Sequence, residues 1–333
     1  MKVGMLDPAG VAVREAKEPT LAGGDLLVKL GACGLCGSDI EKIHGKYGAT
    51  GRIGHEPAGT VSQVAPDVPG FAPGDRVFVH HHVPCYNCAV CRKGAYTFCE
   101  SYQKTNLDPG GFAEVFRAPR ENVSRGAVLS LPSQVSFEEA TMIEPLGCCL
   151  DALRATPFED GDKALVLGLG PIGLLYLRLL RLAGAGSLVG ADVSSFRRQV
   201  AERSGADSTY DPLHPPSHPE NDFDLVVVAT SAVRAVADGI DRTRRGGTLN
   251  LFGLPEKGAQ LPTDLQALYL RGVRIVPTYA TTEYGTRRAL DLIASGRLPV
   301  RDLLTHRFPL RDLPLAVQQA AKVEETIKIV VTP

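Results

Sequence analysis

The chain has 333 residues, of which 44% are hydrophobic, and its formal net charge is −1 at pH 7. This length suggests two domains with sizeable cores, and a charge so close to zero argues against nucleic acid as a partner. There is no apolar run of the roughly 20 residues that a membrane span needs and no signal-peptide pattern at the N-terminus, so we expect a cytoplasmic protein.

The first part of the chain is predicted to be mostly β. Short β-type runs separated by proline and glycine stand at 3–6, 12–15 and 26–32, and further strands are expected up to Val64 and up to Val79. Within this part, Cys36 and Ser38 lie at a loop-to-helix junction, and His55 and Glu56 directly precede a strand.

Residues 80–100 break this pattern, because they contain four cysteines separated by two, two and seven residues: Cys85, Cys88, Cys91 and Cys99. Four thiolates this close together can converge on one ion in a tetrahedral shell, which is typical of structural zinc. An iron–sulfur cluster would use the same ligands, whereas two disulfides are unfavourable in a cytoplasmic chain. A closed sulfur shell has no open position, so we expect this zinc to support a loop and not to react.

Three histidines, His80 to His82, precede the cysteines. Neighbouring residues on a strand point to opposite faces, so the three rings cannot all face one ion. We interpret them as a strand that enters the zinc loop.

Residues 136–155 are predicted to be helical. Ser136 and Glu139 have the spacing of a capping box at the start of the helix. Pro145, which follows Glu144, should bend or restart the helix.

Residues 163–192 have the pattern of a dinucleotide-binding unit: an apolar strand over 164–167, the sequence GLGPIG, an apolar helix over 174–182, a strand over 187–191 and an acid. The three glycines allow a tight turn, close approach of a pyrophosphate and close packing of helix on strand, and the helix N-terminus favours phosphate. The predicted cofactor-binding residues are Gly168, Gly170, Pro171, Ile172, Gly173, Asp192 and Arg197.

Asp192 bears on the choice of cofactor. A carboxylate at the end of the second strand can accept hydrogen bonds from ribose hydroxyls and repels a 2′-phosphate, which favours NAD. Arg197 and Arg198 begin the next helix and offer charges that would suit NADP instead. We expect NAD.

Strands and helices continue to alternate to residue 280, which predicts a doubly wound α/β domain with a parallel sheet of six strands. The Pro- and His-rich stretch 211–220, with His214 and His218, is expected to be an exposed loop. The tail contains two helical stretches, 286–295 and 313–323, and a strand over 326–331.

Four residues remain as a candidate second metal site: Cys36, His55, Glu56 and Glu144. A catalytic zinc uses about three protein ligands and keeps one position open. Cys36 and His55 supply sulfur and nitrogen, and Glu56 and Glu144 compete for the third place. The other carboxylate would bind a zinc-bound water or support the ligands.

Taken together, these motifs resemble the zinc-containing medium-chain dehydrogenase/reductase family. The resemblance rests on CGSD around Cys36, GHEPAG around His55, PGDRV at 73–77, the four-cysteine loop, GGFAE at 110–114, IEPL around Glu144, and GLGPIG, which occur in the family's order across essentially the whole chain. It implies a GroES-like, mostly β catalytic domain made of residues 1–149 and 287–333. It also implies a Rossmann domain over 150–286 and an active site between the two.

IEPL in place of a ligand cysteine resembles the sorbitol, threonine and glucose dehydrogenase branch of the family. The resemblance implies two zincs per chain and a catalytic shell that includes Cys36, His55 and Glu56, with Glu144 close by. Ser38 matches the family's proton-relay hydroxyl. Where many relatives have a further relay histidine, this chain has Glu41, so Glu41, His44 or water would complete the relay.

The resemblance implies hydride transfer from a polyol, sugar or secondary alcohol to NAD, with zinc as a Lewis acid and Ser38 taking part in removing the hydroxyl proton. L-Threonine 3-dehydrogenase is an alternative, for which Arg52 is the candidate cation for a substrate carboxylate. A non-catalytic NAD- and zinc-binding protein is a further alternative. Relatives in the family are dimers or tetramers, so we expect a homo-oligomer, with a tetramer favoured.

Overall fold

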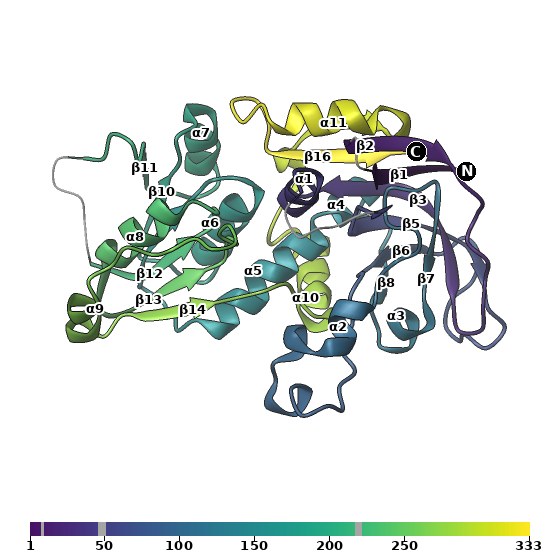
Figure 1. Ribbon diagram of the computed structural model, residues 1–333, viewed down its shortest axis with the longest axis horizontal. Coiled ribbons are helices and arrows are strands. Elements are labelled where there is room, and N and C mark those ends of the chain that lie inside the picture. The colour runs from purple at the N-terminus through teal and green to yellow at the C-terminus, as the bar shows by residue number, and fades with distance from the viewer. Residues whose placement is uncertain (8–9, 46–50, 217–221) are drawn as a thin grey trace. The chain divides into compact units, whose positions relative to one another are not determined.

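Figure 1 shows a computed structural model of the protein, which describes residues 1–7, 10–45, 51–216 and 222–333. The chain forms two compact units. The first consists of Met1–Gly147, Thr281–Lys322 and Thr326–Pro333, and the second of Cys148–Ala280 and Val323–Glu325. None of the described helices is long and apolar enough to span a bilayer.

The first unit is built on a seven-stranded sheet. Six of its strands follow the order β15 (Leu304–Pro309), β16 (Lys328–Thr332), β3 (Leu26–Leu35), β5 (Glu56–Val64), β6 (Arg76–Val79) and β8 (Val128–Ser130), and β7 (Val115–Ala118) also pairs with β3. β15 and β16 are parallel, and the other pairings described in this sheet are antiparallel. The expected tail strand therefore enters this sheet at β16.

A smaller sheet and short helices complete the first unit. The sheet has the order β2 (Gly10–Glu15), β1 (Lys2–Asp7) and β4 (Gly51–Arg52). The helices are α1 (Gly37–Ile43), α2 (Glu100–Lys104), α3 (Arg120–Ser124), α4 (Phe137–Ala140), α10 (Glu283–Ala294) and α11 (Leu313–Ala320), with 3-10 turns at Cys91–Lys93, Tyr96–Phe98, Arg301–Leu303 and Leu310–Asp312. Leu26, Val28, Phe112, Phe116 and Val331 are fully buried in its core.

The unit boundaries fall at 147 and 280, not at the expected 149 and 286. The second boundary lies before α10, because this helix packs within the first unit. A Cβ atom on Gly147 would lie 2.9 Å from Thr281 Oγ1 and 3.1 Å from the Gly285 carbonyl carbon, so the start of α5 (Ile143–Ala155) and the start of α10 are in close contact.

The helical segment 136–155 begins and breaks for local reasons. Ser136 caps α4, since its Oγ accepts from the Glu139 N–H at 3.1 Å while the Glu139 carboxylate accepts from the Ser136 N–H at 3.0 Å, which confirms the capping box. The predicted restart of the helix near Pro145 is confirmed, since α4 ends at Ala140 and α5 begins at Ile143. The chain leaves the helix before Ile143, and Pro145 lies in the first turn of α5, where its missing N–H has no intrahelical partner to lose.

The second unit is a parallel six-stranded sheet with the order β11 (Ser208–Tyr210), β10 (Ser187–Ala191), β9 (Lys163–Leu167), β12 (Phe223–Val228), β13 (Thr243–Leu251) and β14 (Arg274–Pro277). Its helices are α6 (Pro171–Leu182), α7 (Ser195–Arg203), α8 (Val233–Arg242) and α9 (Leu265–Arg271). Strand order reverses between β9 and β12, which is where ligands bind in sheets of this kind. The predicted α/β class and six-stranded Rossmann sheet are confirmed.

Candidate active site and metal centres

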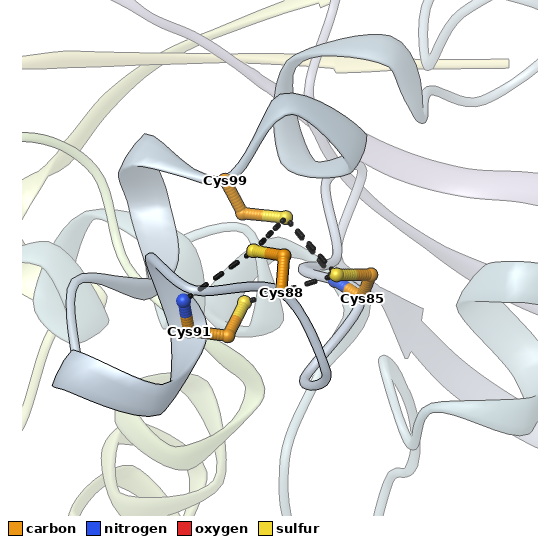
Figure 2. Close-up of side chains that lie close together, drawn as sticks. All are labelled: Cys85, Cys88, Cys91 and Cys99. Atoms are coloured by element: carbon orange, nitrogen blue, oxygen red, sulfur yellow. Dashed lines mark hydrogen bonds between the residues drawn. The ribbon is translucent and has the colours of Figure 1, made fainter.

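The four cysteines converge as their spacing predicted. Figure 2 shows the sulfurs of Cys85, Cys88, Cys91 and Cys99 facing one another. The Sγ–Sγ distances are 3.5 Å for Cys85–Cys99, 3.9 Å for Cys88–Cys99 and 4.0 Å for Cys85–Cys91, and none of the four is in a disulfide. A tetrahedron with Zn–S bonds of ~2.3 Å has edges of about 3.8 Å, so the residues fit a zinc ion.

The backbone favours the thiolate form of two of these cysteines, Cys88 and Cys99, whereas burial raises the pKa of Cys91 to about 12. The N–H of Cys85 lies 3.4 Å from Cys99 Sγ, and the N–H of Cys91 lies 3.4 Å from Cys88 Sγ. Burial opposes ionisation of Cys99, but the N–H groups of Cys85 and Tyr102 outweigh it and lower the pKa of this thiol to about 6. Four sulfurs occupy all positions of a tetrahedron, so the geometry suits a supporting ion.

A second group forms where β3 meets α1 and where β5 begins. Cys36 is the N-cap of α1, and His55 and Glu56 lie at the start of β5. One ligand atom from each of Cys36, His55 and Glu56 lies within 4.8 Å of the other two. Ser38 Oγ is 3.4 Å from both Cys36 Sγ and His55 Nε2, so this hydroxyl points into the same group.

Asp39 holds this group in place. Its carboxylate accepts hydrogen bonds from the N–H groups of Cys36 (3.2 Å) and Gly54 (3.1 Å) and lies 3.3 Å from His55 Nδ1. A proton held on Nδ1 leaves Nε2 of His55 free for a metal. Burial lowers the pKa of His55, but the charges of Asp39 and Cys36 outweigh it, and the pKa stands well above its ordinary value.

Glu56 is fully buried and forms an ion pair with Lys328 of β16. Lys328 Nζ lies 2.5 Å from Glu56 Oε2, and the lysine is only 2% exposed. Gly34 makes room for the pair, since a Cβ atom there would lie 1.8 Å from Glu56 Oε2. Neither oxygen of Glu56 accepts a well-aligned hydrogen bond within the described part of the chain, which leaves both able to face a cation.

Burial lowers the pKa of Lys328, but the negative charges of Glu56 and Cys36 raise it above its ordinary value. The ammonium group is therefore charged, and it balances part of the negative charge that the thiolate and the carboxylate bring into the interior.

Glu144 is not among the ligand atoms that meet at Cys36, although its negative charge also helps to raise the pKa of Lys328. It comes together with His80 and His81, again with one ligand atom of each within 4.8 Å of the others, and all three side chains are buried. The expectation that His80 to His82 continue a strand is wrong, because β6 ends at Val79 and the alternation of a strand no longer applies. His82 does not join the group, since its Nδ1 contacts the Thr105 carbonyl oxygen.

The two relay candidates on α1 differ in exposure. Glu41 is partly buried, and His44, the C-cap of the helix, is exposed. Neither residue is in the group around Ser38. The side chain of Arg52 and the residue His218 lie outside the described part of the chain, and His214 is exposed in the predicted loop.

The glycine sequence forms the predicted turn. Gly168 has φ +93°, which favours glycine, and a Cβ atom on Gly173 would lie 1.9 Å from the Gly168 carbonyl oxygen. Gly170 is the N-cap of α6 and Pro171 its first residue, so the amide groups at the start of the helix remain available for phosphate.

Asp192 stands at the end of β10. Its carboxylate accepts from the N–H groups of Leu169 (2.7 Å) and Ser194 (2.8 Å), which ties the second strand to the glycine turn. Arg197 NH1 lies 4.0 Å from Asp192 Oδ2, whereas Arg198 donates to the Asp192 carbonyl oxygen at 2.6 Å. A cavity of about 270 Å³ opens beside Gly168 and Asp192, at the carboxyl ends of the strands.

Two family models match the chain. The alcohol dehydrogenase GroES-like domain covers residues 22–129, and the zinc-binding dehydrogenase domain covers residues 171–295. Sorbitol dehydrogenase of Rattus norvegicus is 32% identical over 95% of this chain and 91% of its own length. The chain belongs to the zinc-containing medium-chain dehydrogenase/reductase family.

Further similarities support the assignment of the chain to this family. L-Threonine 3-dehydrogenase of Pyrococcus abyssi is 30% identical over 90% of this chain and 88% of its own length. A zinc-binding dehydrogenase of Sinorhizobium meliloti 1021, solved with bound NADP, superposes with a TM-score of 0.89 at 26% identity and covers 100% of this chain and 99% of that one. The protein is therefore a zinc-dependent oxidoreductase that uses a nicotinamide cofactor.

The sequence analysis did not identify two residues that contact the candidate zinc ligands, Asp39 beside His55 and Lys328 beside Glu56. Asp39 is part of CGSD and stands three residues after Cys36, the spacing at which an acid bonds back to a helix N-cap. Lys328 gave a weaker signal, a single lysine in an apolar strand, where a buried lysine requires a partner.

Proposed function

We propose that this dehydrogenase transfers a hydride from the hydroxyl-bearing carbon of a polyol, a sugar or a secondary alcohol to NAD. The observation that carries the proposal is the group of Cys36, which is half-buried, and the buried His55 and Glu56, with the Ser38 hydroxyl 3.4 Å from two of its ligand atoms. Sulfur, nitrogen and oxygen donors with a fourth position left open are the ligands of a catalytic zinc.

Each residue has a distinct task. Cys36, His55 and Glu56 hold the metal, and Asp39 fixes the ring of His55. Lys328 limits the electrostatic cost of burying two anionic ligands. When bound, the zinc supplies Lewis-acid polarisation that lowers the pKa of a hydroxyl, and the nicotinamide supplies the hydride acceptor.

Ser38 is the first group to take the substrate proton. Its hydroxyl can accept a proton from a neighbouring oxygen and pass on its own, which is what a relay requires. Glu41 and His44, further along the same helix α1, are the candidates for passing the proton onward, with water as the alternative.

The second zinc of the proposal is the structural ion of Cys85, Cys88, Cys91 and Cys99, supported by sulfur–sulfur distances of 3.5–4.0 Å. With the catalytic ion, this gives at least two zincs per chain.

NAD is proposed over NADP because a carboxylate at the end of β10, that of Asp192, can accept hydrogen bonds from ribose hydroxyls and would repel a 2′-phosphate. Arg197, whose NH1 lies 4.0 Å from Asp192 Oδ2, offsets part of this negative charge. Its positive charge is the feature that would favour NADP. Cytoplasmic location and assembly into a dimer or tetramer remain predictions of the sequence.

L-Threonine 3-dehydrogenase remains the second candidate, because the Pyrococcus abyssi relative bears that name and is similar over 90% of the chain. An amino acid substrate would need a cation for its carboxylate near the metal, and the candidate for that role is Arg52.

The test is the rate of NADH and NADPH formation across polyols, aldoses, secondary alcohols and L-threonine. Turnover of a polyol, sugar or secondary alcohol with a clear preference for NAD is expected. Turnover restricted to L-threonine would favour the second candidate, and a preference for NADP would contradict the assignment of Asp192. Tight NAD binding without turnover on any of these substrates would contradict the proposed reaction.

A further inference from the structure

His80, His81 and Glu144 form a buried group that the reaction proposed above does not use. Their ligand atoms lie within 4.8 Å of one another, and each side chain is less than 10% exposed, with His80 at 0%. The residues come from two separate segments, the one that follows β6 and the first turn of α5, so their meeting is a product of the fold and not of local sequence.

The histidine nitrogens in this group lack partners. Both ring nitrogens of His80 and Nδ1 of His81 are buried without a hydrogen bond to any described residue. A buried polar atom left unpaired costs about 1–3 kcal/mol, and native proteins rarely leave several together. Each neutral imidazole has one nitrogen lone pair, so unpaired nitrogens on both rings beside a carboxylate point to a ligand that takes one nitrogen from each ring.

Hydrogen bonds to the backbone of His80 and His81 hold the two residues in place. The buried side chain of Asn122 donates from Nδ2 to the carbonyl oxygens of both His80 (2.8 Å) and His81 (3.0 Å). The His80 N–H also donates to the Ala127 carbonyl at 2.9 Å. On the other side, the ring of His82 packs on that of His81 with centroids 4.0 Å apart. The pair is held from several directions, as a preformed binding site requires.

We propose that His80, His81 and Glu144 form a binding position for a divalent transition-metal cation, in addition to the positions at Cys36 and at the four cysteines. Two neutral imidazoles and one carboxylate are a donor set for zinc, cobalt or ferrous iron, and three protein ligands leave coordination positions open.

The new position adjoins the first one. The ring centroids of His55 and His81 are 5.0 Å apart. A ligand of the proposed position, His81, therefore adjoins a ligand of the first one, His55.

The test replaces the metals of the purified full-length protein with Co²⁺ and counts cobalt per chain by mass spectrometry. Wild type is expected to bind three ions, and His80→Phe and His81→Phe two. Phenylalanine keeps the ring and removes the nitrogens, so in the metal-free protein His80→Phe should fold at least as well as wild type. Glu144→Gln keeps the size of the side chain and removes the ligand that comes from the other segment, so this variant should also bind two ions.

Two controls identify the lost ion. His82→Phe changes the neighbouring ring, whose Nδ1 already contacts the Thr105 carbonyl, and should keep three ions. Cys36→Ser should lose one ion together with part of the thiolate-to-cobalt absorption, whereas His81→Phe should lose one ion and leave that absorption unchanged. Two ions in wild type, or three in both His80→Phe and His81→Phe, would overturn the proposal. Turnover is not measured, so failure of the proposed dehydrogenase reaction would leave this result intact.

Discussion

Replacing Lys328 by methionine tests the buried ion pair that supports the candidate active site. In the metal-free protein, the substitution keeps an unbranched side chain but leaves the Glu56 carboxylate, 0% exposed, without its cation. Removing one partner of a buried pair costs about 3–5 kcal/mol, because the remaining charge is uncompensated. For a unit of this size each kcal/mol shifts the midpoint by roughly 2–4 °C, so the first unit should melt on the order of 10 °C lower.

Differential scanning calorimetry is the suitable assay, because the two units can unfold in separate transitions. Lys29→Met is the matched control, since Lys29 lies on the neighbouring strand β3 with its side chain exposed, and it should change the midpoint by no more than about 2 °C. Adding Glu56→Gln to Lys328→Met should restore much of the loss, because the buried charge is then gone. A Lys328→Met midpoint equal to that of Lys29→Met would refute the reasoning.

Three further predictions concern the metal and cofactor sites. Asp39→Asn should weaken zinc retention in the catalytic site about 10–100-fold, measured by competition with a chelator, because His55 loses the carboxylate that orients it. Asp67→Asn is the control, since the Asp67 carboxylate accepts from the remote Gly24 N–H, and it should leave zinc retention unchanged. Asp192→Asn should shift the ratio of kcat/KM for NAD over NADP toward NADP by about tenfold or more, and an unchanged ratio would contradict the assigned role. Cys99→Ser should remove one zinc per chain and increase proteolysis of the four-cysteine loop, and an unchanged zinc count would contradict the structural site.

The sequence predicted the sites that depend on local spacing. The GLGPIG turn and the four-cysteine loop each lie within about twenty residues, so residue type and separation already determine the geometry. The strand from Ser187 to Ala191 was predicted to the residue for the same reason, since glycine and aspartate mark its ends.

Contacts between distant segments were not predictable in this way. The Glu56–Lys328 pair depends on β16 entering the sheet next to β3, with Gly34 leaving the space between them. The expectation for His80 and His81 was wrong because it assumed that β6 continues past Val79.

We propose that Cys36, His55 and Glu56 hold the metal that catalysis needs. The most direct test of this proposal is the Cys36→Ser variant, assayed for NAD reduction with the substrate that wild type turns over, with zinc counted on the same sample. Turnover and the zinc at this site should both be lost, while the four-cysteine zinc remains. Full activity in this variant would contradict it.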